Sequence, residues 1–125
     1  MQRFAPVLGA LAALMGAGGV ALAAAATHAG GGGNGETAAY FLILHAAALI
    51  GVTACVRAYA DIAAALLLAG AALGLGTIVF SADLATRAFS GARLFPFAAP
   101  IGGSLMILAW LSLAAIFAIG LLRRS

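Results

Sequence analysis

The sequence predicts an all-α integral membrane protein, a bundle of four transmembrane helices. Of its 125 residues, 66% are hydrophobic and only 7% are charged, and the mean hydropathy is +1.20. In an average soluble domain roughly a quarter of the residues are charged. Four apolar runs, separated by charged or glycine- and proline-containing segments, have the ~20-residue length that crosses a bilayer. These observations exclude a soluble globular domain.

The predicted helices cover residues 4–26, 37–56, 62–82 and 98–122, within one membrane domain, 1–125. The first helix follows Arg3, the second ends at Arg57, and the third begins after the short link that follows. Pro100 suits the first turn of the fourth helix, which ends before Arg123. None of the runs alternates with the period of a membrane β-strand, so helices are the spanning structure that remains.

Small residues supply the helical periodicity, because nearly every position is apolar. In lipid, Gly, Ala and Ser allow helix backbones to approach closely. The third run contains Gly70 and Gly74 at four-residue spacing. The first and fourth runs carry similar stripes: Gly9, Ala13, Gly16 and Val20, and Gly102, Ala109, Ser112 and Gly120. We expect these stripes to face neighbouring helices.

The distribution of arginines predicts that both termini lie in the cytoplasm, because cytoplasmic flanks carry an excess of positive charge. Four arginines would lie on the side of the termini and two on the other: Arg3, Arg57, Arg123 and Arg124 against Arg87 and Arg93. An alternative is that the first run is a cleaved secretory signal ending near 24–26, which would leave three spans. Its length, beyond the usual 7 to 15 apolar residues, favours a retained helix.

Several function classes find no support in the residues. The net charge of +3 comes from six scattered arginines without a basic patch, so we expect no nucleic-acid partner. The single Cys55 cannot form an intrachain disulfide. The glycines of 30–35 fit Gly-x-Gly-x-x-Gly, but no strand precedes them, and we interpret 27–36 as a flexible outer loop. No cofactor and no metal site is expected.

His45 is the first candidate functional residue. It lies about eight residues into the second predicted helix, roughly 10 Å below the outer surface, where an ionisable ring should face the bundle. Two interpretations are open. His45 is a functional group, as a proton relay or as a metal or cofactor ligand, or it is a neutral imidazole that bonds to a helix carbonyl or hydroxyl and joins two helices. No second intramembrane acid or histidine lies three or four residues away, which favours the neutral imidazole. His28 should differ from it in depth by about two turns, so shared haem ligation is not expected.

Asp83 and Arg87 form the second candidate, a possible polar site within the membrane. They are four residues apart and can pair along one helix face. Asp83 follows an apolar segment, at a depth where a partner such as Arg87 or Arg93 is needed to keep it ionised. A ligand or ion would be sought here. By contrast, we interpret Arg57 and Asp61 as an interfacial pair that closes a tight turn.

Several short motifs follow one another along the chain. They are Ala26-Thr27-His28, His45-Ala46-Ala47-Ala48-Leu49, Phe80-Ser81-x-x-Leu84, and Ala99-Pro100-Ile101-Gly102-Gly103 followed by Ala109-Trp110. This series resembles a family of small bacterial inner-membrane proteins of unknown function, the domain of unknown function four-two-three, to which a eukaryotic small transmembrane protein is related. The resemblance implies four transmembrane helices in a bacterial plasma membrane. It implies no activity, so no catalytic residue is transferred.

We expect a structural, interaction or accessory protein of the inner membrane that is not an enzyme. Its surroundings would be the lipid bilayer, with itself or a larger membrane complex as possible partners. The alternative is a small transporter or channel component in which His45, Asp83 and Arg87 line a polar route. A membrane enzyme or haem carrier ranks last. If His45 and Asp83 share a hydrated cavity, the transport hypothesis gains; if each is capped by local hydrogen bonds, it fails.

Overall fold

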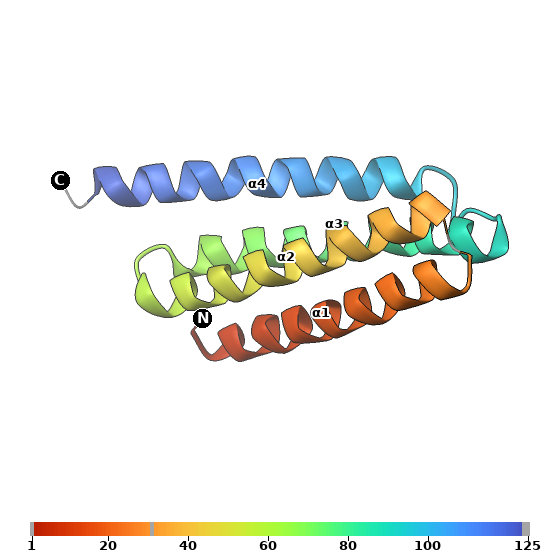
Figure 1. Ribbon diagram of the computed structural model, residues 1–125. Helices are drawn as coiled ribbons and strands as arrows, with labels where there is room; N and C mark the ends of the chain where they lie inside the picture. Colours follow the sequence, from red (N-terminus) through yellow and green to blue (C-terminus); the bar gives the residue numbers. More distant parts are fainter. Residues whose placement is uncertain (1, 31, 124–125) are drawn as a thin grey trace.

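The computed structural model is all-helical over the residues that it describes, 2–30 and 32–123, and contains no strand there. A 3-10 turn, Gln2–Phe4, precedes four helices: α1 (Ala5–His28), α2 (Gly32–Ala58), α3 (Ala63–Ser90) and α4 (Ala98–Leu122). Each of these helices is long and apolar enough to cross a membrane. Successive helices run in opposite directions, so both ends of the chain lie at one end of the molecule (Figure 1). The prediction of four membrane-spanning helices is confirmed.

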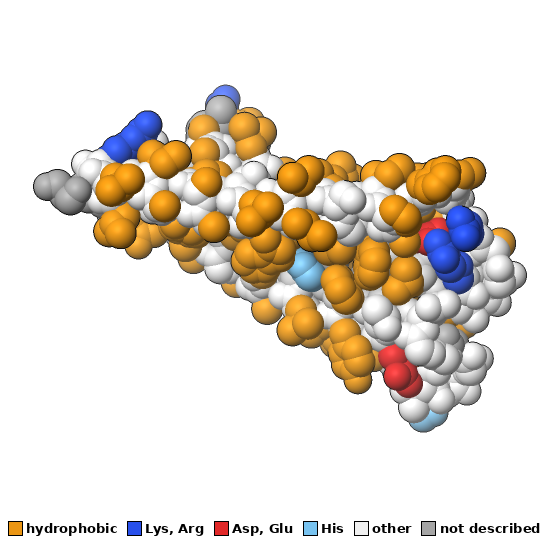
Figure 2. Space-filling model, turned by 90° about the horizontal axis from the view of Figure 1, so that it is seen from above, with side chains coloured by type: hydrophobic (Ala, Val, Ile, Leu, Met, Phe, Trp, Pro, Cys, Tyr) orange, Lys and Arg blue, Asp and Glu red, His pale blue; other side chains and the backbone are white. Residues whose placement is uncertain are grey.

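The helices pack in chain order. α1 packs on α2, α2 on α3 and α3 on α4, while α1 touches α3 over a smaller area. The core lies between the helices and is built from aliphatic side chains such as Leu49, Leu66 and Leu73, none of which is exposed. On the face shown in Figure 2, hydrophobic side chains cover the length of the molecule and charged side chains gather at its two ends. This distribution matches a bilayer with a hydrocarbon core and polar surfaces.

Two helices extend beyond their predicted ends. α3 continues past residue 82 to Ser90, where Gly91 ends it with a φ of +70°. α2 begins at Gly32, so the flexible loop predicted over 27–36 is wrong for residues 32–36. A Cβ at Gly35 would lie 2.9 Å from the Cβ of Ala26, so this glycine packs closely against α1, and Gly30, which lies between the helices, has a φ of +79°. Composition suggested a loop throughout, whereas residues 32–36 form the first turn of α2 beside the end of α1.

The stripe predicted on α1 combines two faces of that helix. Gly9 and Gly16 face α2, as expected. Ala13 and Val20 are exposed instead. Larger residues such as Met15 complete the buried face. The prediction is therefore wrong at two of its four positions, because small size alone does not show which side of an alanine-rich helix is buried.

The stripes predicted on α3 and α4 agree better with the packing. Gly70 and Gly74 are buried against leucine side chains of α1 and α2. Three of the four small residues predicted on α4 are buried: Gly102, Ala109 and Gly120. The fourth, Ser112, is exposed, and its hydroxyl donates to the carbonyl of Leu108 at 2.8 Å.

α3 and α4 approach each other closely at Gly76 and Gly102. A Cβ at Gly102 would lie 2.6 Å from the backbone nitrogen of Phe80 and 2.7 Å from the carbonyl oxygen of Gly76. A Cβ at Gly76 would lie 2.9 Å from the carbonyl oxygen of Gly102. Backbone atoms cannot rotate away as a side chain can. Glycine is therefore required on both sides of this contact.

The substitution Gly102→Ala should separate α3 from α4 and lower the free energy of unfolding by about 1–3 kcal/mol, the usual cost of overpacking. The measurement is a titration of the micelle-embedded protein with a denaturing detergent, followed by circular dichroism. Gly18→Ala is the matched control, because a Cβ at Gly18 meets no atom within 4 Å. Equal effects of the two substitutions would contradict the proposed contact.

Candidate functional site

His45 is the central residue of α2, with thirteen helical residues on either side. It lies about 20 Å along the helix from Gly32. The helix begins five residues earlier than predicted, and the depth of roughly 10 Å below the outer surface stays a prediction. Trp110 is likewise the central residue of α4, with twelve residues on either side.

Both nitrogens of the His45 ring have partners within the chain. Nδ1 lies 2.8 Å from the carbonyl oxygen of Phe41, and the indole nitrogen of Trp110 lies 3.3 Å from Nε2. An indole N–H can only donate, so Nε2 accepts this bond and Nδ1 carries the proton that is donated to Phe41. The ring is therefore neutral in this arrangement. It joins α2 to α4, which is one of the two interpretations left open by the sequence.

Aromatic rings surround this hydrogen bond. The Phe41 ring stacks on His45 with its centroid 5.5 Å away, and it lies 4.7 Å from the ring of Phe80 on α3. The Trp110 ring meets His45 edge-on at 6.1 Å. These four residues, the aromatic cluster, bring together side chains of α2, α3 and α4. Since α4 packs mainly on α3, the cluster also connects α4 with α2.

Asp83 lies in the C-terminal part of α3 and is fully buried. One carboxylate oxygen, Oδ1, accepts a hydrogen bond of 2.8 Å from the backbone amide of Leu94. The other, Oδ2, forms an ion pair with the guanidinium of Arg87, four residues further along the helix. The structure thus contains the pair that the four-residue spacing suggests. The sequence does not predict the contact with Leu94. Every residue except proline has a backbone amide, so the residue types do not show which amide is the donor.

The bond to Leu94 fixes the segment that connects α3 to α4. This segment begins at Gly91 and ends at Phe97, whose φ of +65° is unusual for a residue other than glycine. Asp83 holds the middle of the segment against α3, and α4 starts directly after Phe97. The pair of Asp83 and Arg87 is therefore a structural anchor for the start of α4.

The two candidate sites do not meet. A hollow beside the aromatic cluster is lined by Phe41, His45, Phe80, Gly103, Met106, Ile107 and Trp110. Asp83 and Arg87 do not line it. His28 is exposed at the end of α1. Within the described ranges there is no group of three or more side chains that could hold a metal ion.

Residues 8–103 match a family described as "Protein of unknown function (DUF423)". The match covers well over half of the chain, from α1 to the first turns of α4. The chain belongs to the DUF423 family. No curated protein and no solved structure matches it. The family resemblance predicted from the sequence is confirmed. The DUF423 match includes His45, Asp83 and Gly102, whereas Trp110 lies beyond it.

The bond between His45 and Trp110 is testable in this DUF423 protein by a double-mutant cycle. We expect His45→Phe and Trp110→Phe each to lower the free energy of unfolding. The double variant should lose about 0.6 kcal/mol less than the sum of the two single losses, because interhelical hydrogen bonds in membranes average about that value. Detergent-induced unfolding provides the free energies. A control cycle uses Leu111→Phe, at the exposed neighbouring position, in place of Trp110→Phe. The coupling energy between His45→Phe and Leu111→Phe should be zero. Additive effects of His45→Phe and Trp110→Phe would disprove the bond.

The anchor at Asp83 is testable by Asp83→Asn. The amide keeps an oxygen for the amide of Leu94 but leaves the partly buried Arg87 without a counter-charge. We expect a loss of about 2 kcal/mol in the free energy of unfolding, less than for a fully buried pair because Arg87 is 29% exposed. Glu36→Gln, an exposed acid at the same end of the molecule, should change stability by less than about 0.5 kcal/mol. If both variants unfold alike, the anchor does not exist.

Proposed function

We propose that this multi-pass membrane protein has a structural or accessory role and no enzymatic activity of its own. The observation that carries the proposal is the bonding of the two polar side chains that the sequence singles out, His45 and Asp83. Both nitrogens of His45 are bonded within the chain, and both oxygens of Asp83 are engaged by Leu94 and Arg87. Because each of these groups has its partners within the chain, its burial is explained without a bound ligand or ion.

The same observation argues against the alternative, a transporter or channel component that uses His45, Asp83 and Arg87. A polar route requires side chains that line one water-filled space. Apart from His45 and the indole of Trp110, the hollow at His45 is lined by apolar side chains and a glycine. Asp83 does not line it. The geometry supports two separate structural contacts instead.

Association with another helix is supported by the outward face of α1. Only 22% of its most apolar window is buried. Six of the residues that it exposes are alanine or glycine: Ala10, Ala13, Ala17, Gly18, Ala21 and Ala24. In lipid, small outward residues allow another helix to approach closely. We propose that the protein packs through such faces against itself or a larger complex.

We also propose that the membrane is a bacterial inner membrane, with both termini in the cytoplasm. The described arginines support this orientation. Arg3, Arg57 and Arg123 lie at the end that holds the termini, and Arg87 and Arg93 lie at the other end. An excess of arginine in short flanking segments is typical of the cytoplasmic side.

Photo-cross-linking in native membranes tests the interaction role. A photoreactive residue replaces one outward residue at a time: Ala17 on α1, Ala47 on α2 or Leu111 on α4. We expect a discrete protein adduct from at least one position, while Leu49, which is fully buried, gives none as the control. In parallel, liposomes containing the purified protein should pass protons and small ions no faster than protein-free liposomes. Absence of any adduct together with increased flux would overturn the proposal in favour of transport.

A further inference from the structure

Two arginines are held near each other by one buried carboxylate, at the end of the molecule opposite the termini. Asp83 forms its ion pair with Arg87 through Oδ2, and its Oδ1 accepts the backbone amide of Leu94. This amide is joined directly to Arg93, which lies close enough to Asp83 to interact with it electrostatically. Figure 2 shows basic side chains gathered beside an acidic one at this end. Arg87 and Arg93 form the arginine pair.

The arginine pair carries one positive charge more than Asp83 offsets. Both oxygens of Asp83 are engaged, and Arg93 has no ion pair with any residue that the structure describes. Glu36, the other acid at this end, lies exposed on α2 and is not paired with either arginine. Arg93 is exposed, and so is 29% of the Arg87 side chain. Both guanidinium groups can therefore donate N–H groups to a ligand that approaches from outside the protein.

The arginine pair lies at the depth of the lipid headgroups. α3 has 28 residues and is about 42 Å long. The hydrocarbon core of a bilayer is about 30 Å thick, and the bilayer with its headgroup regions is about 40–45 Å thick. With α3 centred in the bilayer, Arg87 is about 16 Å from the middle, just beyond the hydrocarbon. The connecting segment, which contains Arg93, lies further out.

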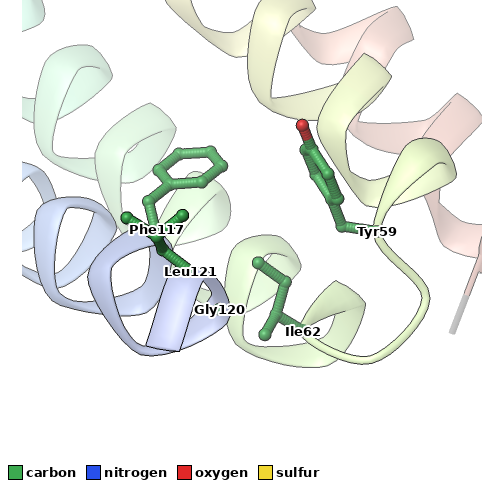
Figure 3. A pocket seen from close by; sticks show the side chains of 5 residues that line it. All are labelled: Tyr59, Ile62, Phe117, Gly120 and Leu121. Atoms are coloured by element: carbon green, nitrogen blue, oxygen red, sulfur yellow. The ribbon is translucent and has the colours of Figure 1, made fainter. Parts of the chain in front are cut away.

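The aromatic side chains at the two ends of the molecule differ in what they contact. At the end that holds the termini, Tyr59 and Phe117 face each other across a hollow, with ring centroids 6.4 Å apart (Figure 3). At the other end, three phenylalanines lie within four residues of Arg93 and are exposed: Phe89, Phe95 and Phe97. None of the three contacts another aromatic ring of the described chain. Exposed apolar side chains grouped in this way are typical of a surface that contacts a membrane or a protein.

We propose that the arginine pair binds the phosphate of an anionic phospholipid in the leaflet opposite the termini. Guanidinium groups bind phosphate oxygens through parallel N–H donors. Asp83 holds Arg87 by the ion pair and the backbone beside Arg93 by the hydrogen bond, so less conformational freedom is lost when a phosphate binds. The one remaining positive charge matches the single negative charge of a phosphodiester. The exposed phenylalanines would contact the upper part of the acyl chains.

Native mass spectrometry of the full-length protein in a lipid-free, uncharged detergent measures the affinity for the first bound lipid. The probes are phosphatidylglycerol and a diacylglycerol with identical acyl chains, which lacks the phosphate. We expect phosphatidylglycerol to bind more tightly. Arg93→Gln should weaken its binding about fivefold, the contribution of one basic side chain at a membrane surface, and should leave the binding of diacylglycerol unchanged. Arg57→Gln, an exposed arginine at the other end, is the matched control and should change neither affinity.

The Arg93 guanidinium makes no bond within the described chain, so Arg93→Gln should also leave the free energy of unfolding unchanged, which separates lost binding from lost folding. Unchanged affinity of Arg93→Gln for phosphatidylglycerol would overturn the proposal. Equal weakening by Arg57→Gln would overturn it too, because it would indicate general attraction to a basic protein.

Added inorganic phosphate distinguishes a lipid site from a site for a soluble anion. We expect an equimolar concentration to displace no phosphatidylglycerol, and displacement would contradict the lipid assignment. The site requires the membrane but no second protein, so it is independent of the packing role proposed above. Cross-linking to a partner protein bears only on that role, and failure of one proposal is therefore distinguishable from failure of the other.

Discussion

The backbone contact between Gly76 and Gly102 determines where α4 lies. Moving an apolar side chain from lipid into the protein interior releases little free energy, so helices in a membrane associate through close packing rather than through exclusion of water. α4 packs mainly on α3, and the Cβ distances show that its backbone touches α3 directly at Gly102. Trp110 lies about two turns further along α4. Its reach to His45 on α2 therefore depends on the separation and rotation of α4 that the glycine contact permits.

A second constraint is that polar groups within a membrane need partners from the protein itself. Several hydroxyl groups satisfy it locally by donating to the carbonyl oxygen four residues earlier, as Thr53, Thr77 and Thr86 do. Such bonds stay within one helix and position nothing else. His45 and Asp83 differ because each also has a partner in another element: Trp110 on α4 for His45, and Leu94 in the connecting segment for Asp83. Together with the glycine contact, these bonds hold α4 against the other helices at three positions: at Leu94 just before the helix, at Gly102 and at Trp110.

The sequence predicts the spans well where charges or prolines mark their ends. α4 covers the predicted residues 98–122, because Pro96 precedes it, Pro100 suits its first turn and Arg123 follows it. At the start of α2 and the end of α3 the prediction is wrong, since polar and glycine-rich segments continue the helix once another helix packs against them. The pair of Asp83 and Arg87 is visible as a four-residue spacing. The partner of His45 is not, because it depends on how α4 is rotated about its axis.

The same geometry explains why His45 is compatible with apolar surroundings. If His45 were an open site, the space between α2 and α4 would need water at its centre, where an unpaired polar group is costly. The indole N–H of Trp110 is the partner of Nε2 and comes from the protein itself. On the side of the termini, the hollow between α2 and α4 is lined by apolar and small side chains next to the indole. Both nitrogens of His45 thus take their partners from the chain, and the space around them is otherwise apolar.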